Sequence, residues 1–155
     1  MLFRSLDAFP LEYGEILRTH VTVLGGSPFD GLAIHQEDLR RACETQVKAH
    51  LLHLREGYLE AGGRPQPIAD LVAGSAPAFA ALLRNVARLA GVTSRERMEA
   101  MREGARAAGL PDGIVADILG LERPATLPAS DPARLFPEYL KAVEQLARAV
   151  DTWRA

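Results

Sequence analysis

Apolar residues recur every three or four positions along most of the chain after residue 35, which is the spacing of one face of an α-helix. The clearest stretch is 36–61, where charged residues occupy the opposite side and Gly62-Gly63 follows as a helix-ending pair. Further helices are predicted over about 67–90, 93–108 and 131–153, with a short helix near 111–119. The apolar stripe of the first helix consists of Leu39, Cys43, Val47, Leu51, Leu54 and Tyr58.

Two signals indicate where the later helices begin. The segment Thr93-Ser94-Arg95-Glu96 has the pattern of a capping box, with threonine followed by glutamate three residues later. Before the last helix, either Ser130 or Asp131 is placed to cap, and Pro132 suits the first turn. Successive amphipathic helices joined by short turns favour antiparallel packing. The sequence therefore predicts an all-α fold, an up-and-down four-helix bundle over residues 35–155.

Residues 1–34 lack this pattern. The stretches 11–13 (LEY) and 21–24 (VTVL) favour β structure, and the glycine- and proline-containing run at 25–28 breaks the chain after them. We expect a short, partly extended N-terminal arm, made of two short strands or of one strand and irregular structure. Because an unpaired strand edge is a template for pairing, we predict that residues 9–24 pair with another chain and form a homodimer.

Composition narrows the class of protein. Hydrophobic residues make up 48% and charged residues 25%, as in a soluble domain, and the net charge of −2 argues against general nucleic-acid binding. One cysteine excludes an intramolecular disulfide framework. We find no signal-peptide pattern and no run of about 18 apolar residues, so a cytoplasmic location without a membrane span is the simplest expectation.

The first long helix carries a row of candidate binding residues. Arginine suits phosphate geometry, so the row is a candidate contact for a nucleotide phosphate. The alternative is a solvated face whose charges pair with one another at helical spacing. The row consists of Arg41, Glu44, Lys48 and Arg55.

Other chemistry on this helix is sparse. His50 and His53 are three residues apart, but a zinc site needs three or four ligands. Cys43 lies in the apolar stripe, which favours a buried inert thiol over a nucleophile, although Arg40 and Arg41 beside it leave the second reading open. We expect no metal site and no cofactor.

Several phrases of the chain resemble the C-terminal region of bacterial nucleotidyltransferase-domain proteins. In that family an FPLE-type strand closes the catalytic domain, and a helical bundle follows that is similar to the substrate-binding domains of kanamycin-type nucleotidyltransferases. The resemblance implies a substrate-binding or partner-binding helical module in which Glu44, Arg55 and Tyr58 face the nucleotide or partner. The phrases that carry it are Phe9-Pro10-Leu11-Glu12 and the stretches 20–25, 39–44, 51–59 and 75–84.

The chain departs from that family where the transfer chemistry resides. Nucleotidyl transfer needs a Gly-Ser turn followed by Asp-x-Asp to hold two metal ions. Gly26-Ser27 is present, but no Asp-x-Asp or Asp-x-Glu occurs in the sequence. We therefore predict a non-catalytic module without catalytic residues, with a nucleotidyltransferase catalytic subunit as its partner and a nucleotide as its ligand. Two alternatives stay open: a nucleotide-processing enzyme that uses Glu44, His50, His53 or Arg55, and a purely structural oligomerising protein.

Overall fold

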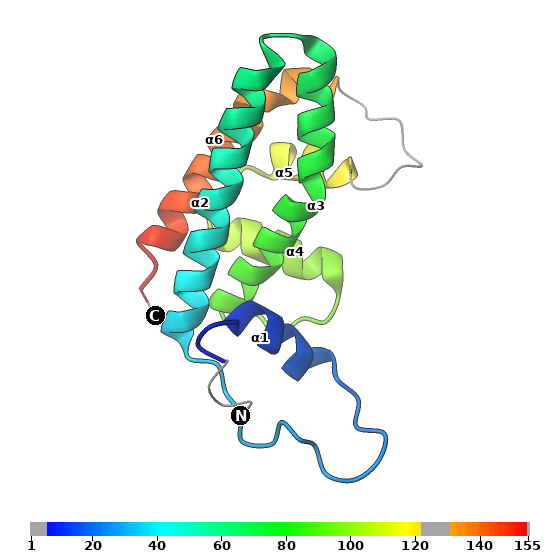
Figure 1. The fold of residues 1–155 in the computed structure, drawn as a ribbon, viewed down its shortest axis with the longest axis vertical. Coiled ribbons are helices and arrows are strands. Elements are labelled where there is room, and N and C mark those ends of the chain that lie inside the picture. Colours follow the sequence, from blue (N-terminus) through cyan, green and yellow to red (C-terminus); the bar gives the residue numbers. More distant parts are fainter. Residues whose placement is uncertain (1–5, 122–130, 155) are drawn as a thin grey trace.

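The computed structural model describes residues 6–121 and 131–154, which form six α-helices and no strand (Figure 1). The all-helical prediction is confirmed, but the described chain has six helices instead of a four-helix bundle. The helices are α1 (Pro10–Thr19), α2 (Gln36–Ala61), α3 (Pro65–Leu89), α4 (Arg97–Ala107), α5 (Asp112–Gly120) and α6 (Pro132–Asp151).

The long helices α2 and α3 form a hairpin, and α6 packs against both (Figure 1). α2 begins and ends at the predicted residues. It ends at Ala61 because Gly62 and Gly63, which follow it, adopt the left-handed conformation at φ 59° and 77°. α3 begins at Pro65, whose fixed φ suits a first helical turn. α4 and α5 pack against α3, and α1 packs against the start of the hairpin.

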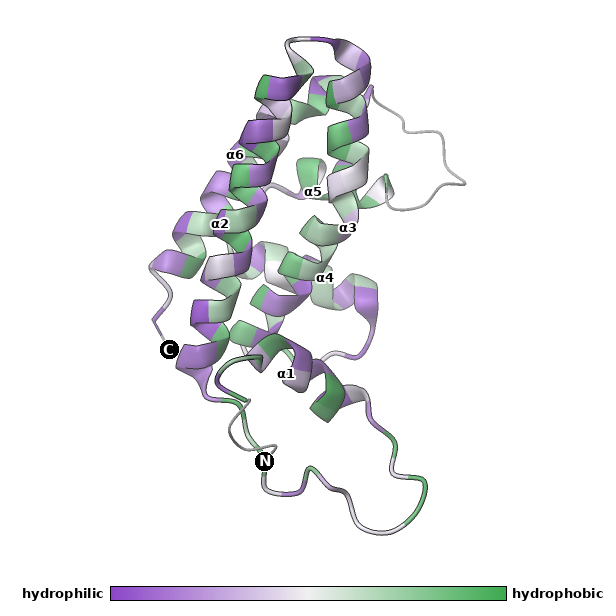
Figure 2. Cartoon of the chain, viewed as in Figure 1, coloured by the Kyte–Doolittle hydropathy of each residue, from purple (hydrophilic) through white to green (hydrophobic). Residues whose placement is uncertain are grey.

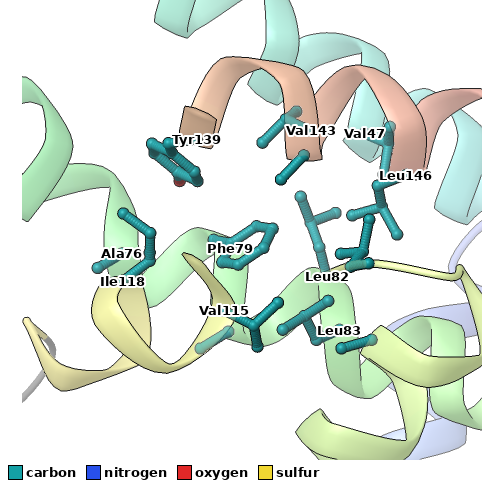
Figure 3. Packing of buried hydrophobic residues seen from close by; sticks show 14 of the residues in the cluster. Val47, Ala76, Phe79, Leu82, Leu83, Val115, Ile118, Tyr139, Val143 and Leu146 are labelled. Atoms are coloured by element: carbon teal, nitrogen blue, oxygen red, sulfur yellow. The ribbon is translucent and has the colours of Figure 1, made fainter. Parts of the chain in front are cut away.

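The core lies around α3, which contacts α2, α4, α5 and α6. Phe79 of α3 meets Tyr139 of α6 edge to face, with ring centroids 5.2 Å apart; in the view of Figure 3, Val115 of α5 lies below Phe79 and Ile118 of α5 lies to its left. By length and composition α3 is also apolar enough to cross a membrane, but here its apolar positions pack into the protein core. Along α2 and α6 polar and apolar residues alternate in the hydropathy colouring, as expected of helices with one polar and one apolar face (Figure 2).

The start of α4 differs from the predicted capping box. The cap is Glu96, whose carboxylate accepts hydrogen bonds from the backbone N–H groups of Met98 (3.0 Å) and Glu99. Thr93 lies before the helix, and the Ser94 hydroxyl instead accepts from the N–H of Glu96. Glu96 caps the free amides of a helix that begins at Arg97, so the helix starts three residues later than a Thr93 cap would place it.

α6 begins after Asp131, which is one of the two predicted capping residues. The Asp131 carboxylate accepts a hydrogen bond of 3.0 Å from the N–H of Ala133, and Pro132 occupies the first turn. Ser130 lies outside the described residues.

The prediction of extended structure at 11–13 is wrong, because these residues lie inside α1. Pro10 starts this helix, Glu12 near its N-terminus and Arg18 near its C-terminus complement the helix dipole, and Leu11 is buried in the core. Residues 20–35 form an irregular connection between α1 and α2. This connection projects away from the helices (Figure 1). Residues 21–24 form no strand there.

Candidate functional site

The predicted row of binding residues lies along one face of α2, and its charges are paired within the protein. Arg41 pairs with Glu37 at 3.1 Å, and Glu44 pairs with Arg40 at 2.9 Å and also with Lys48. The hydrogen bonds from Lys48 and Arg40 lower the pKa of Glu44. This end of the row therefore has the arrangement of the solvated, self-paired face.

The other end of the row connects α2 to α6. Arg55 pairs with Glu144 at 2.8 Å, and Tyr58 stacks on Phe136 with ring centroids 4.5 Å apart. Binding of a nucleotide or partner by this row stays a prediction. Any such ligand has to compete with the ion pairs that already engage its charges.

His50 and His53 do not form a common site. His50 is buried in the core and His53 is exposed. The Tyr139 hydroxyl lies 2.8 Å from Nε2 of His50 and accepts a hydrogen bond of 3.2 Å from Ser75. Burial lowers the pKa of His50 to about 4, so the ring is neutral at pH 7 and Nε2 is able to accept the Tyr139 proton.

Cys43 is fully buried, as the inert reading requires. Burial raises the pKa of its thiol to about 11, against a smaller opposing effect of Arg88. A thiol that is protonated and covered does not act as a nucleophile. Within residues 6–121 and 131–154, no group of three or more histidine, cysteine or acidic side chains is arranged to hold a metal ion.

A polar cavity occurs elsewhere, between α1, the C-terminal half of α3 and the segment before α4. Its volume is about 510 Å³. We call it the arginine pocket, because its lining includes Arg18, Arg84, Arg88, Arg95 and Arg97.

Arg88 joins two walls of the arginine pocket. Its Nη1 donates to the backbone carbonyl of Leu11 at 3.1 Å and to the side chain of Asn85 at 3.4 Å. Arg18, on α1, holds the Glu15 carboxylate with Nη2 and reaches the backbone carbonyl of Ser94 at 3.5 Å with Nη1. These contacts tie α1 to α3 and to the segment before α4.

Sequence reasoning missed these arginines, because they come from three separate segments of the chain. One signal was present in the pattern. Arg84 and Arg88 are four residues apart near the end of an otherwise apolar helix, and Arg95 and Arg97 follow after a short turn. Two basic pairs on either side of one turn indicate a local cationic surface.

A second feature adjoins the pocket: residues 21–26, which we call the finger. His20 lies at the base of the finger, with its Nδ1 atom 3.1 Å and 3.0 Å from the carbonyl oxygens of Ile16 and Leu17. Because carbonyl oxygens only accept hydrogen bonds, Nδ1 carries the ring proton. Nε2 then accepts from the Ser27 hydroxyl at 3.1 Å. Within the described chain, residues 21–26 make no backbone hydrogen bond to other backbone groups.

The comparisons with protein-family models, with curated proteins and with solved structures find no match to this chain.

Proposed function

We propose that this chain is a non-catalytic helical module that associates with another polypeptide through the finger. The observation that carries the proposal is the exposure of three neighbouring apolar side chains: Val21 is 82% exposed, Val23 93% and Leu24 94%. Contiguous exposed apolar residues mark interaction sites. A connection as long as residues 20–35 without secondary structure is uncommon in compact domains and usually functional.

Strand pairing is the mode of association that the finger fits. Valine and threonine favour extended backbone, and in a strand Val21 and Val23 point to one face while Thr22 and Leu24 point to the other. The backbone groups of the finger make no bonds to one another, so they are available to an adjacent strand. The hydrogen bond between His20 and Ser27 holds the two ends of the finger together.

The partner in the purified protein is a second copy of the chain. Two copies of one extended segment pair antiparallel about a two-fold axis, and each finger then covers the other. The resemblance to nucleotidyltransferase-domain proteins supports a second partner, a catalytic subunit that offers a sheet edge to the same finger. Pairing of either kind removes the apolar side chains from water.

Size-exclusion chromatography with light scattering tests this proposal. We expect the wild-type protein to have the mass of a dimer at concentrations on the order of tens of micromolar. Val23→Asp places a charge in the pairing surface and is expected to give the monomer mass. Leu59→Asp, at a side chain that is 78% exposed on α2, is the matched control and should remain dimeric. A wild-type protein that stays monomeric at these concentrations contradicts the pairing of two copies.

A further inference from the structure

The arginine pocket concentrates positive charge in a chain whose net charge is −2. Its lining carries five arginines and one carboxylate, that of Glu15. Burial lowers the pKa of Arg88; Glu15 opposes this effect and the like charge of Arg18 adds to it. Like charges at short range repel, and a bound anion relieves that repulsion.

Arg18 also has a hydrogen-bond donor that the described residues leave unused. The Nε atom of Arg18 is buried and has no hydrogen-bond partner among the described residues. A guanidinium presents five N–H donors, and the hydrogen bonds of Arg18 to Ser94 and Glu15 use only its two terminal nitrogens. A buried donor without a partner costs free energy, which an acceptor entering the pocket restores.

We propose that the arginine pocket is a binding site for a diphosphate or triphosphate group, as carried by a nucleotide. Arginine binds phosphate oxygens with two parallel hydrogen bonds. One phosphate group carries about −1.5 to −2 charges near neutral pH and offers three acceptor oxygens, whereas the guanidinium groups that line the pocket come from three segments of the chain. A chain of two or three phosphates carries more negative charge and has more acceptor oxygens for these separate guanidinium groups.

The dimensions of the pocket agree with this ligand class. A volume of about 510 Å³ lies within the range of roughly 300–1,000 Å³ that is usual for small-molecule sites. His20 and Val21 line the pocket from the side of the finger and give it a less charged wall for the organic part of the ligand. The site is distinct from the row on α2, where the sequence predicted a nucleotide contact.

Isothermal titration calorimetry with pyrophosphate and with ATP, at constant ionic strength, tests the proposal on the full chain. We expect saturable binding of both, and weaker binding of inorganic phosphate. Arg18→Gln and Arg95→Gln should each weaken pyrophosphate binding about tenfold or more, because each removes a charge-assisted contact. Arg95 is exposed, so its replacement tests the site without disturbing the core. Arg134→Gln on α6, whose side chain is 86% exposed, is the matched control and should bind as the wild type does.

A second variant tests the sign of the electrostatic argument. Glu15→Gln removes the carboxylate that competes for Arg18, so pyrophosphate should bind several-fold more tightly. The proposal is overturned if the wild type shows no saturable binding, if Arg134→Gln weakens binding as much as Arg18→Gln does, or if Glu15→Gln weakens it. Val23→Ser, which removes the apolar side chain from the finger without adding a charge near the pocket, should leave pyrophosphate binding unchanged, so failure of the anion site and failure of finger pairing are separate results.

Discussion

The guanidinium of Arg88 occupies the space that a side chain on Gly14 would need. A Cβ atom on Gly14 would lie 1.5 Å from Nη2 of Arg88. Gly14 is inside α1 and is not among the glycines with positive φ, so a turn does not explain it. The glycine instead lets Arg88 cross α1 and donate to the carbonyl of Leu11. One contact therefore anchors α1 and places a positive charge in the arginine pocket.

Gly14→Ala should separate stability from anion binding. Alanine favours the helix by about 1 kcal/mol over glycine, which offsets much of the lost hydrogen bond from Arg88. We expect the free energy of unfolding in urea to change by less than about 1 kcal/mol, while pyrophosphate affinity falls several-fold because the guanidinium is displaced. Calorimetry beside urea unfolding measures both quantities. Wild-type affinity in this variant would show that the position of Arg88 does not matter to the site.

Gly104 is a point of close approach between α4 and α3. A Cβ atom on Gly104 would lie 1.9 Å from the backbone carbonyl oxygen of Leu83, and backbone cannot move aside as a side-chain end can. Gly104→Ala should therefore destabilise the protein by about 1–3 kcal/mol or more in urea unfolding. Gly74→Ala on α3 is the matched control, since nothing lies within 4 Å of the added atom, and it should stabilise by up to about 1 kcal/mol. Equal effects of the two substitutions would contradict the close packing of α4.

His50 should make the protein less stable in acid. Its folded pKa of about 4 lies below the ordinary 6.5, so between these pH values the unfolded chain takes up a proton that the folded chain excludes. The free energy of unfolding should fall as pH decreases from 6.5 to 4, by roughly 3 kcal/mol from this residue. Urea unfolding at several pH values measures the slope. His50→Gln should flatten it, whereas His53→Gln, at an exposed position, should not; a slope that survives His50→Gln assigns the effect to other groups.

Cys43 should react with alkylating reagents only when the protein opens. Its thiol is fully buried, and burial raises its pKa to about 11, so little thiolate is present at pH 8. Labelling by iodoacetamide should be slower in the native protein than in urea by roughly a hundredfold or more. Mass spectrometry of the alkylated protein over time gives both rates. Native labelling as fast as in urea would mean that the α2 stripe is exposed at Cys43.

The accuracy of the sequence predictions follows the strength of the local signals. α2 has an uninterrupted apolar stripe and a terminal glycine pair, and both of its ends are predicted correctly. α1 has only a short pattern, and the β preference of residues 11–13 is outweighed when Leu11 is buried against the core. At α4 two residues with capping ability compete, and only the folded geometry shows that Glu96 prevails over Thr93.

The arginine pocket illustrates what periodicity leaves out. A repeat of three or four reports neighbours on one helix, so it finds the row on α2, whose charges turn out to be paired. Arg18 is far in sequence from Arg88 and Arg95, and only the packing of α1 across the end of α3 brings it beside them. The exposed finger is different: its β-favouring residues are visible in the sequence, and the structure adds that they are unpaired within the described chain.

Amide hydrogen exchange of the finger, measured as a function of protein concentration, tests finger pairing most directly. Pairing predicts that the amides of residues 21–26 exchange rapidly in dilute protein, become protected at concentrations where the dimer forms, and lose that protection in Val23→Asp. Rapid exchange of these amides at every concentration, with no difference between wild type and Val23→Asp, would contradict the account.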